Sequence, residues 1–512
     1  MNPDGIQLSL FTSRINAVCE EMGSLLGRVA LSPNIRDRLD YSCALFDACG
    51  RLLGQATHIP VHLGSMAHAM AGVVSQFEWQ RGHCVVFNDP FQGGTHLPDV
   101  TFVSPVFHGD LLVGFAANRA HHANIGADTP GSMPISRSLD EEGVLIPPRL
   151  VVNAGQRDAA WFSDIAERMG SRPDTEGDFA AQLSANQLGV RRTALLAEHY
   201  GAGRWRALCG ALQDHGRTLA QQVLATIPRG HYVFEDFLDD DGLGHEDLRI
   251  RVEVAVDGDD VQVSFDGTAP QVPGNLNCPM SVTAAAVGYV FRCLIPDHAP
   301  ACHGTFSAWR IEAPEACLVN ARAPAAVAAG NVETSMRIVD ALCGALASAL
   351  PDQIPAASQG TMNNIAMGAR GENSWDYYET LAGGHGAGPG WHGLAARHSH
   401  MTNTLNTPVE VLERHYPLRI RRYALRPGSG GQGQFRGGVG VIREYQFLAD
   451  ARVSLLTERR RTAPWGLNHG GEAVRGSNLL DDKAIPGKCE LDVKAGQCLR
   501  VETPGGGGYG KP

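Results

Sequence analysis

Glycine most constrains the fold of this chain, because 60 of its 512 residues are glycine and many gather in three stretches. These stretches cover 383–390, 428–440 and 505–510, and the sequence around them is varied rather than repetitive. Glycine adopts the backbone conformations that tight turns require. We therefore expect tight turns between strands at these places. From about Glu410 onward, where β-branched residues are also frequent, we expect a mostly β region.

The earlier part of the chain mixes helical and strand-like patterns. Apolar residues recur every three or four positions across 10–29 and 63–77, which predicts two helices. The runs 101–107 and 111–118 flank His108-Gly109-Asp110 and predict a hairpin. Further helices are expected over 177–225, 282–294 and 335–350, and further strands over 42–46, 51–54, 84–88 and 252–265.

These patterns predict an α+β fold, with helical segments in the first two thirds and a glycine-rich, mostly β C-terminal part. No fixed-period repeat and no flexible linker is apparent. We therefore expect tightly packed regions, divided as 1–175, 176–400 and 401–512.

Composition and net charge indicate a globular protein that does not bind nucleic acid. The chain is 43% hydrophobic and 19% charged, which is ordinary for a globular protein. Its formal charge is −11 and it has no run rich in Lys or Arg. Such a chain would repel a phosphate backbone, so nucleic acid is not an expected partner.

Location and redox state are predicted from the N-terminus and the cysteines. Residues 1–8 lack the basic start and apolar stretch of a secretory signal, and no run approaches the roughly 18 to 20 apolar residues that span a bilayer. The twelve cysteines are scattered, without a C-x-x-C pair. We expect reduced thiols and a cytoplasmic protein without membrane contact. Cys84, inside an apolar run, is expected to be a core residue rather than a nucleophile.

The most informative stretch is 88–99, with the sequence N-D-P-F-Q-G-G-T-H-L-P-D. The two glycines let the backbone bend sharply, and the proline disfavours an α conformation at Leu97. His96 and Asp99 are therefore expected on a shaped loop. The predicted hairpin then returns the chain to His121 and His122, beside that loop.

Two imidazoles and a carboxylate can hold a divalent ion and leave positions open for water or substrate. His121 and His122 are adjacent, so in an extended chain they face opposite sides and at most one binds the same ion. The spacing H-x-x-D is common by chance, so hydrogen-bonded loop residues remain the alternative. For His58 and His62 a structural role is the better interpretation.

Two glycine-rich segments resemble nucleotide loops only superficially. The segment 428–433 matches G-x-G-x-x-G, but 437–442 looks like a strand, whereas a dinucleotide loop precedes a helix. The segment 505–511 approaches a P-loop, but Pro512 stands where Ser or Thr is needed. We therefore predict no ATP site in this chain.

The stretch 88–99 resembles the signature N-D-P-(aromatic)-x-G-G-T-H-x-x-D of B-type subunits in the hydantoinase/oxoprolinase family. That group is similar to the C-terminal half of 5-oxoprolinase and, more remotely, to subunits of acetone and acetophenone carboxylases. The resemblance extends along nearly the whole chain. Its other blocks are 38–44, 58–66, 177–182, 274–277, 330–335, 400–413, 426–443, 458–471 and 503–510.

The resemblance implies a site for one divalent metal ion, which would be Zn, Mn or Fe. Carried over residue by residue, its ligands are His96, Asp99, His121 and Asp40, so 1–175 becomes the metal-binding region. His122 is a candidate for proton transfer. The chain departs from the family pattern at 124–127 and 392–393, which concerns the identity of the substrate more than the metal.

The family resemblance also implies a reaction. It is ATP-dependent hydrolysis of a cyclic amide such as a hydantoin, 5-oxoproline or a related lactam. An A-type partner subunit with an actin-like nucleotide fold would use Mg-ATP to phosphorylate the ring carbonyl oxygen. The metal would lower the pKa of a water molecule to about 7 and so supply the nucleophile.

Two alternatives remain: a subunit of an ATP-dependent ketone carboxylase, and a non-catalytic scaffold subunit. The length of 512 residues favours the hydantoinase type over the longer carboxylase subunits. A scaffold has no need of convergent metal ligands, so metal content separates it from the other two.

Overall fold

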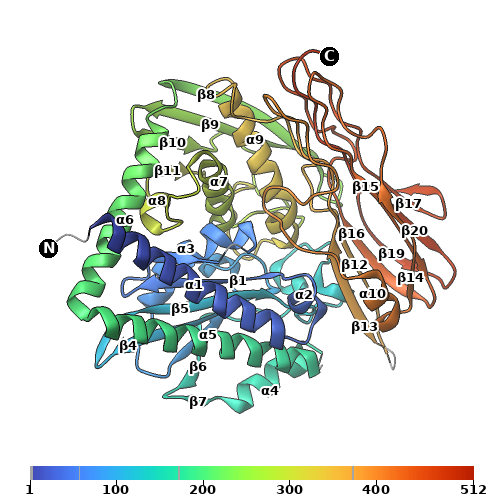
Figure 1. Cartoon of the computed structure of the whole chain (residues 1–512). Helices are drawn as coiled ribbons and strands as arrows, with labels where there is room; N and C mark the ends of the chain where they lie inside the picture. The colour runs from blue at the N-terminus through green and yellow to red at the C-terminus, as the bar shows by residue number, and fades with distance from the viewer. Residues whose placement is uncertain (1–3, 57, 171–172, 372–373) are drawn as a thin grey trace.

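The computed structural model describes residues 4–56, 58–170, 173–371 and 374–512. Its elements form an α+β fold, as predicted, in which a mixed N-terminal body lies beside a C-terminal β unit (Figure 1). Among the residues described, no helix is both long and apolar enough to cross a membrane. Cys84 is buried, and burial raises the pKa of its thiol to about 12, which agrees with the predicted core role.

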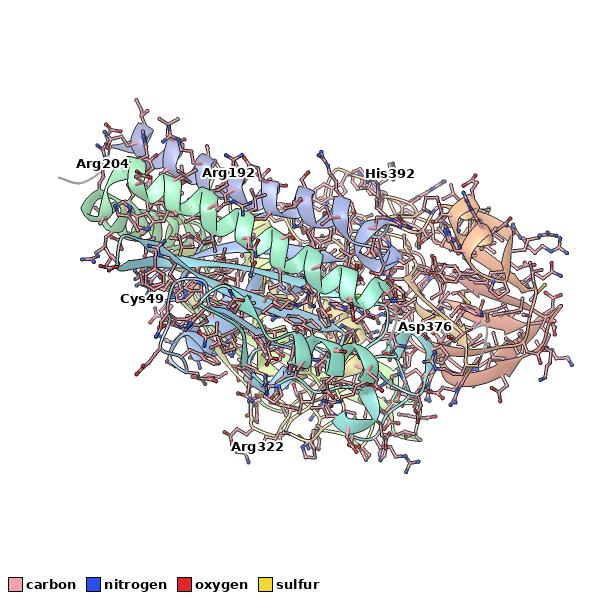
Figure 2. The ribbon with its side chains drawn as sticks, turned by 90° about the horizontal axis from the view of Figure 1, so that it is seen from below. Cys49, Arg192, Arg204, Arg322, Asp376 and His392 are labelled. Carbon is pink, nitrogen blue, oxygen red and sulfur yellow. The ribbon has the colours of Figure 1, made fainter. Side chains whose placement is uncertain are left out.

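A seven-stranded sheet forms the base of the N-terminal body, with the order β2-β1-β5-β4-β3-β6-β7. Helices α1 (Gly5–Val29), α5 (Pro173–Tyr200) and α6 (Ala202–Leu224) cover one face. In Figure 2, α1 and α5 lie side by side across that face. The strands are β1 (Tyr41–Asp47), β2 (Leu52–Gln55), β3 (Cys84–Phe87), β4 (Asp99–His108), β5 (Leu111–His121), β6 (Arg149–Asn153) and β7 (Gln156–Arg157).

Helix α1 follows directly from its sequence pattern. Its buried residues include Phe11, Ile15 and Met22, at the three- and four-residue spacings of one helical face. The carboxylate of Asp4 accepts a hydrogen bond from the Gln7 amide at 2.7 Å and caps the first turn.

Helix α3 (Pro60–Val74) covers the other face of this sheet and packs in turn against α7 (Met280–Leu294). The contact is close, since a Cβ on Gly64 would lie 2.8 Å from Cα of Ala285. Helices α7 and α9 (Ser335–Ala347) pack on a second sheet with the order β11-β10-β9-β8. Its strands are β8 (Gly230–Asp240), β9 (Glu246–Asp257), β10 (Asp260–Ser264) and β11 (Trp309–Glu312).

The C-terminal unit contains two sheets that share one hydrophobic core, with the orders β13-β12-β16-β19 and β14-β15-β20-β17-β18. The mostly β C-terminal part is therefore confirmed. Packing crosses both expected divisions, because α5 and α6 join the first sheet and β12 and β13 join this unit. The strands are β12 (Asn364–Ala369), β13 (Trp375–Thr380), β14 (Leu418–Leu425), β15 (Val441–Phe447), β16 (Ala451–Leu456), β17 (Ser477–Leu480), β18 (Lys483–Ile485), β19 (Lys488–Val493) and β20 (Cys498–Glu502).

Short helices complete the fold. The α-helical ones are α2 (Pro33–Arg36), α4 (Ala159–Arg168), α8 (His303–Phe306) and α10 (Val409–His415). Three 3₁₀ segments are η1 (Pro90–Gln92), η2 (Pro130–Ser132) and η3 (Leu139–Glu142), and the π-helical segment η4 (Gly330–Thr334) leads into α9.

The glycine stretches differ from the prediction of tight turns. Most of their glycines lie in extended segments that pack backbone to backbone; those with positive φ include Gly390, Gly428 and Gly510. The amide of Gly506 donates to the carbonyl of Gly438 at 2.9 Å. A Cβ on Gly506 would lie 1.9 Å from the His385 carbonyl oxygen. Glycine is required here because neighbouring chains come too close for any side chain.

Candidate metal centre

Three neighbouring strands bring the predicted site residues into one row. β1 pairs with β5 so that Tyr41 lies opposite Ala120, and β4 pairs with β5 so that Asp99 lies opposite His121. Asp40 immediately precedes β1, and its carbonyl accepts a hydrogen bond from the His121 amide at 3.0 Å. The predicted hairpin therefore does return the chain beside Asp99.

The loop before β4 is held in a tight bend. Asp89 caps η1 by accepting a hydrogen bond from the Phe91 amide at 2.9 Å. Gly93 has φ of 98°, and a Cβ on it would lie 2.4 Å from Cα of Ala69. The side chain of Asn88 donates to the Leu97 carbonyl at 2.8 Å and ties the two ends of the loop together. This bend turns His96 into the interior.

His96, Asp99 and His121 form the group of potential metal ligands in the described part of the chain. One ligand atom from each lies within 4.8 Å of the others. The three residues are at most 3% exposed. Nε2 of His96, Oδ1 of Asp99 and Nε2 of His121 have no hydrogen-bond partner among the residues described, although Nε2 of His96 lies 3.4 Å from Oδ1 of Asp99. Leaving one buried polar atom unpaired costs about 1–3 kcal/mol, so three in one place indicate a missing ligand.

The other polar atoms of these side chains are engaged. Nδ1 of His96 lies 3.3 Å from the Ala328 carbonyl, which favours a proton on that nitrogen and a lone pair on Nε2. Nδ1 of His121 lies 3.1 Å from the His122 carbonyl. Oδ2 of Asp99 accepts a hydrogen bond from the Thr95 hydroxyl at 2.5 Å. Such outer contacts orient metal ligands and fix their tautomers.

An aromatic side chain further fixes His121. Its ring stacks on Tyr378 with centroids 4.9 Å apart and planes inclined by 4°. The Arg38 guanidinium lies over the same Tyr378 ring, 4.7 Å from its centroid.

The charge states of Asp99 and His121 suit a cation. Burial favours the neutral carboxyl, but the imidazoles of His96 and His62 hold the pKa of Asp99 well below its ordinary value. Burial and the neighbouring His96 lower the pKa of His121 well below its ordinary value, so His121 offers a lone pair. For His96, burial acts in the same direction, but the Asp99 carboxylate raises its pKa above the ordinary value.

Asp40 is buried and lines the same small cavity as the three residues, but it is not part of their mutually close group. Burial raises the pKa of Asp40, although Arg38 lies 3.8 Å away. His122 does not line the cavity. Its Nε2 lies 2.9 Å from Oε1 of Gln182, and its ring packs against Phe179. His121 and His122 thus have separate surroundings, as expected for adjacent residues of an extended chain.

Sequence reasoning missed the place of His62 in the site. His62 lies on α3 and lines the cavity, with Nε2 3.3 Å from Oδ2 of Asp99. Its Nδ1 lies 3.0 Å from the Ser42 hydroxyl. Pro60 at the start of α3 was a signal for the helix, but the approach of that helix to β4 depends on tertiary packing.

The two departures from the family pattern lie outside the residues that line the cavity. Oδ1 of Asn124 accepts hydrogen bonds from the Gly126 amide and the Ser132 hydroxyl and so shapes its own loop. Nδ1 of His392 accepts a hydrogen bond from the Arg436 amide at 2.9 Å. Both residues are therefore used in local structure.

Comparison with known proteins decides the family. The profile described as Hydantoinase B/oxoprolinase matches residues 4–512. The chain belongs to the hydantoinase B/oxoprolinase family. It is 38% identical to 5-oxoprolinase 1 of Arabidopsis thaliana over 99% of its own length, but it spans only 42% of that protein. It is 32% identical to a Pseudomonas protein assigned as the B-type subunit of a D-/L-hydantoinase, covering 99% of this chain and 90% of the other.

Two solved structures share the fold. The ATP-dependent caprolactamase from Pseudomonas jessenii superimposes with a TM-score of 0.93 at 28% identity, covering all of this chain and 92% of the other. A nucleotide-free acetone carboxylase superimposes with a TM-score of 0.88 at 17% identity, covering 99% of this chain and 76% of the other. At that lower identity the likeness concerns the fold alone.

Proposed function

We propose that this chain is the metal-bearing subunit of an ATP-dependent hydrolase of cyclic amides. The observation that carries the proposal is the convergence of Nε2 of His96, Oδ1 of Asp99 and Nε2 of His121, all buried and without a hydrogen-bond partner in the described structure. A scaffold subunit would gain nothing from such an arrangement. Relatives named for action on 5-oxoproline, hydantoins and caprolactam supply the substrate class.

The residues present fit a divalent metal ion. His96, Asp99 and His121 would hold it, and Asp40 is the proposed fourth ligand. Imidazole and carboxylate ligands suit Zn, Mn and Fe about equally. When bound, such an ion would acidify water near neutral pH and thus supply the nucleophile for ring opening.

The chain's own residues prepare this site. Thr95 and His62 hold Oδ2 of Asp99, so that Oδ1 remains directed at the imidazoles. Ala328 and Tyr378 fix the rings of His96 and His121. Burial of the whole group excludes bulk water, which strengthens the attraction between the carboxylate and a cation.

We further propose that ATP is used by an A-type partner with an actin-like nucleotide fold, which carries Mg-ATP and phosphorylates the ring carbonyl oxygen. The support is the relative assigned as a B-type hydantoinase subunit and the match to less than half of the longer 5-oxoprolinase. The segment 428–433 leads into strand β15, so it does not open a helix as a dinucleotide loop would.

The test is to co-express the chain with an A-type subunit and assay the pair with hydantoin, 5-oxoproline and caprolactam. We expect ring opening that requires ATP, no turnover of ATP or of any cyclic amide by this chain alone, and a hetero-oligomer by native mass measurement. ATP-dependent carboxylation of a ketone without ring opening would support the carboxylase alternative. Robust ATP hydrolysis by the single chain would contradict the division of labour.

A further inference from the structure

Asn331 is a buried polar residue of the metal cavity that the ligand set leaves unused. It lies in the π-helical segment η4 (Gly330–Thr334), and π-helical turns occur frequently at functional sites. The Gly330 amide donates to the Asn275 carbonyl at 2.9 Å. A Cβ on Gly330 would lie 1.8 Å from the Asn277 carbonyl oxygen. These contacts fix the position of the turn.

Asn331 lines the cavity, and its side-chain oxygen lacks a hydrogen-bond partner in the described structure. The residue is 3% exposed and lines the same cavity as His96, Asp99 and His121. Its Oδ1 has no hydrogen-bond partner within the described ranges of the chain. An unpaired buried acceptor costs about 1–3 kcal/mol unless a ligand satisfies it.

The backbone around Asn331 also supports the metal ligands. The Ala328 carbonyl, three residues earlier, contacts Nδ1 of His96. The amides of Val327 and Ala328 in turn donate to Oε1 of Glu142 at 2.8 and 2.9 Å. One rigid segment therefore orients a ligand of the ion and presents a carboxamide to the same space.

The size of the cavity limits what Asn331 can meet there. The cavity is about 20 Å³, and a single water molecule needs at least about 10–15 Å³. This space therefore admits a water molecule beside Asn331. An amide oxygen accepts hydrogen bonds, so a water O–H is a suitable partner for Oδ1 of Asn331.

We propose that Asn331 accepts a hydrogen bond from the water molecule that attacks the ring and holds it in the attacking orientation. This inference rests on the proposed function. Asn331 is a water-positioning residue and not a ligand of the metal ion. Its loss disturbs the geometry of attack while the ion stays in place.

The test compares Asn331→Ala, Asn331→Asp and the control Asn320→Ala in the complex with the A-type partner. Asn320 is a half-buried asparagine that contacts the Ala313 carbonyl and does not line the cavity. Asn331→Ala should keep the metal content and melting temperature of the wild type and lose about 100-fold in kcat, since small misplacements of a reactant cost that much. KM should change little. Asn331→Asp keeps an acceptor oxygen, so its kcat should be at least about tenfold higher than that of Asn331→Ala. Asn320→Ala should have the kcat of the wild type.

A second measurement does not depend on activity. A crystal structure of the metal-loaded chain should show an ordered water within hydrogen-bonding distance of Oδ1 of Asn331. Contact of that oxygen with the ion itself, or loss of metal from a folded Asn331→Ala, would overturn the inference. So would a wild-type kcat for Asn331→Ala in an active complex. If the wild-type complex opens no cyclic amide, the proposed function is wrong. The crystal structure then tests the inference by itself, and an Oδ1 of Asn331 without a bound water molecule would reject it.

Discussion

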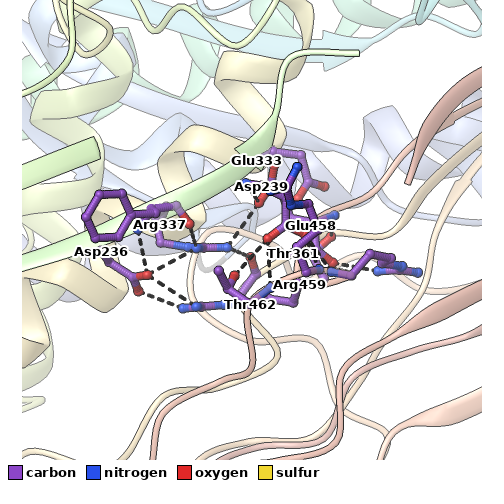
Figure 3. A network of polar contacts seen from close by, with 12 residues as sticks. Asp236, Asp239, Glu333, Arg337, Thr361, Glu458, Arg459 and Thr462 are labelled. Carbon is purple, nitrogen blue, oxygen red and sulfur yellow. Dashed lines mark hydrogen bonds and ion pairs between the residues drawn. The ribbon is translucent and has the colours of Figure 1, made fainter. Parts of the chain in front are cut away.

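The chain contains two buried polar clusters that have opposite character. One is the candidate metal centre, where three potential ligand atoms lie together without a hydrogen-bond partner in the described structure. The other is an ionic network at the junction of β8, α9 and the C-terminal unit (Figure 3). In the network, Arg459 contacts Asp236 at 2.7 Å and Asp340 at 2.8 Å. Nearby, Arg337 contacts both Asp236 at 3.2 Å and Glu458 at 3.3 Å.

The two clusters differ in role, since one holds parts of the fold together and the other is a candidate ligand site. Each of these buried cations meets carboxylates, and Lys488 lies 2.5 Å from Glu458, so opposite charges are paired within the protein. The residues of the network come from β8, from α9, from the segment after β16 and from the start of β19, and it therefore joins two parts of the fold. In the candidate metal centre, three potential ligand atoms instead converge without a hydrogen-bond partner in the described structure. Nε of Arg337 and Nε of Arg459 also lack hydrogen-bond partners, so convergence of imidazole and carboxylate atoms, rather than an unpaired atom alone, distinguishes the two clusters.

The largest effect is expected from removing a metal ligand. His96→Ala should lose the bound ion and nearly all ring opening, because the remaining ligands leave a divalent ion under-coordinated. ATP binding by the partner should persist. His122→Ala is the matched control, since its imidazole contacts Gln182 outside the cavity and the ion should stay. Metal analysis and a ring-opening assay check both variants. Equal metal content in His96→Ala and the wild type would show that His96 is not a ligand of the ion.

Breaking the ionic network should instead lower stability. Asp236→Asn leaves Arg337 and Arg459 short of negative charge in a buried place, which costs about 3–5 kcal/mol. Chemical denaturation should show this loss in the free energy of unfolding, with unchanged metal content. The control is Arg192→Ala, which breaks an exposed contact with Glu21 at 2.7 Å and should cost less than about 1 kcal/mol. Loss of metal in Asp236→Asn would show that the ionic network and the candidate metal centre are coupled, and would contradict their separate roles.

The network should also weaken in acid. Burial favours the neutral form of Asp239, but Arg337, Lys488 and nearby backbone amides lower its pKa to about 2. A carboxyl with a lowered pKa contributes stability above its unfolded value, and that contribution is lost as the pH falls from about 4 to about 2. The loss is worth about 2 kcal/mol. Unfolding measured across this range should be less dependent on pH in Asp239→Asn, and an identical slope in the two proteins would contradict the assignment.

A smaller effect is expected from loosening Asp99 without removing it. Thr95→Val keeps the shape of the side chain but removes the hydroxyl that donates to Oδ2 of Asp99. Loss of such an outer contact typically lowers metal affinity by about 10–100-fold. Thr95→Ser restores the donor and should recover most of the affinity. Competition with a chelator measures the three affinities. If valine and serine give the same affinity, the hydroxyl does not orient Asp99.

The part of the site that sequence could predict is the part built from local structure. The hairpin of β4 and β5 follows from two apolar runs around a turn, and its register alone brings His121 beside Asp99. The family resemblance supplied Asp40. The α+β class followed in part from the helical periodicity of residues such as Ile15 and Val18.

The rest depends on packing between distant segments. His62 reaches Asp99 because α3 lies across the sheet, and Asn331 reaches the cavity through a π-helical turn more than 200 residues later in the chain. Neither approach leaves a local pattern in the sequence. The glycine stretches were misinterpreted for a related reason, since the close approach of Gly506 to the His385 backbone is visible only when both segments are in place.

The central claim is that the three unpaired atoms of the first cluster hold one divalent ion. Metal analysis of the purified wild-type chain, combined with anomalous X-ray scattering at the edge of the metal found, tests it most directly. We expect one ion per chain, bound by Nε2 of His96, Oδ1 of Asp99 and Nε2 of His121. A chain that takes up no metal after loading with Zn, Mn or Fe, or an ion bound away from these three atoms, would contradict it.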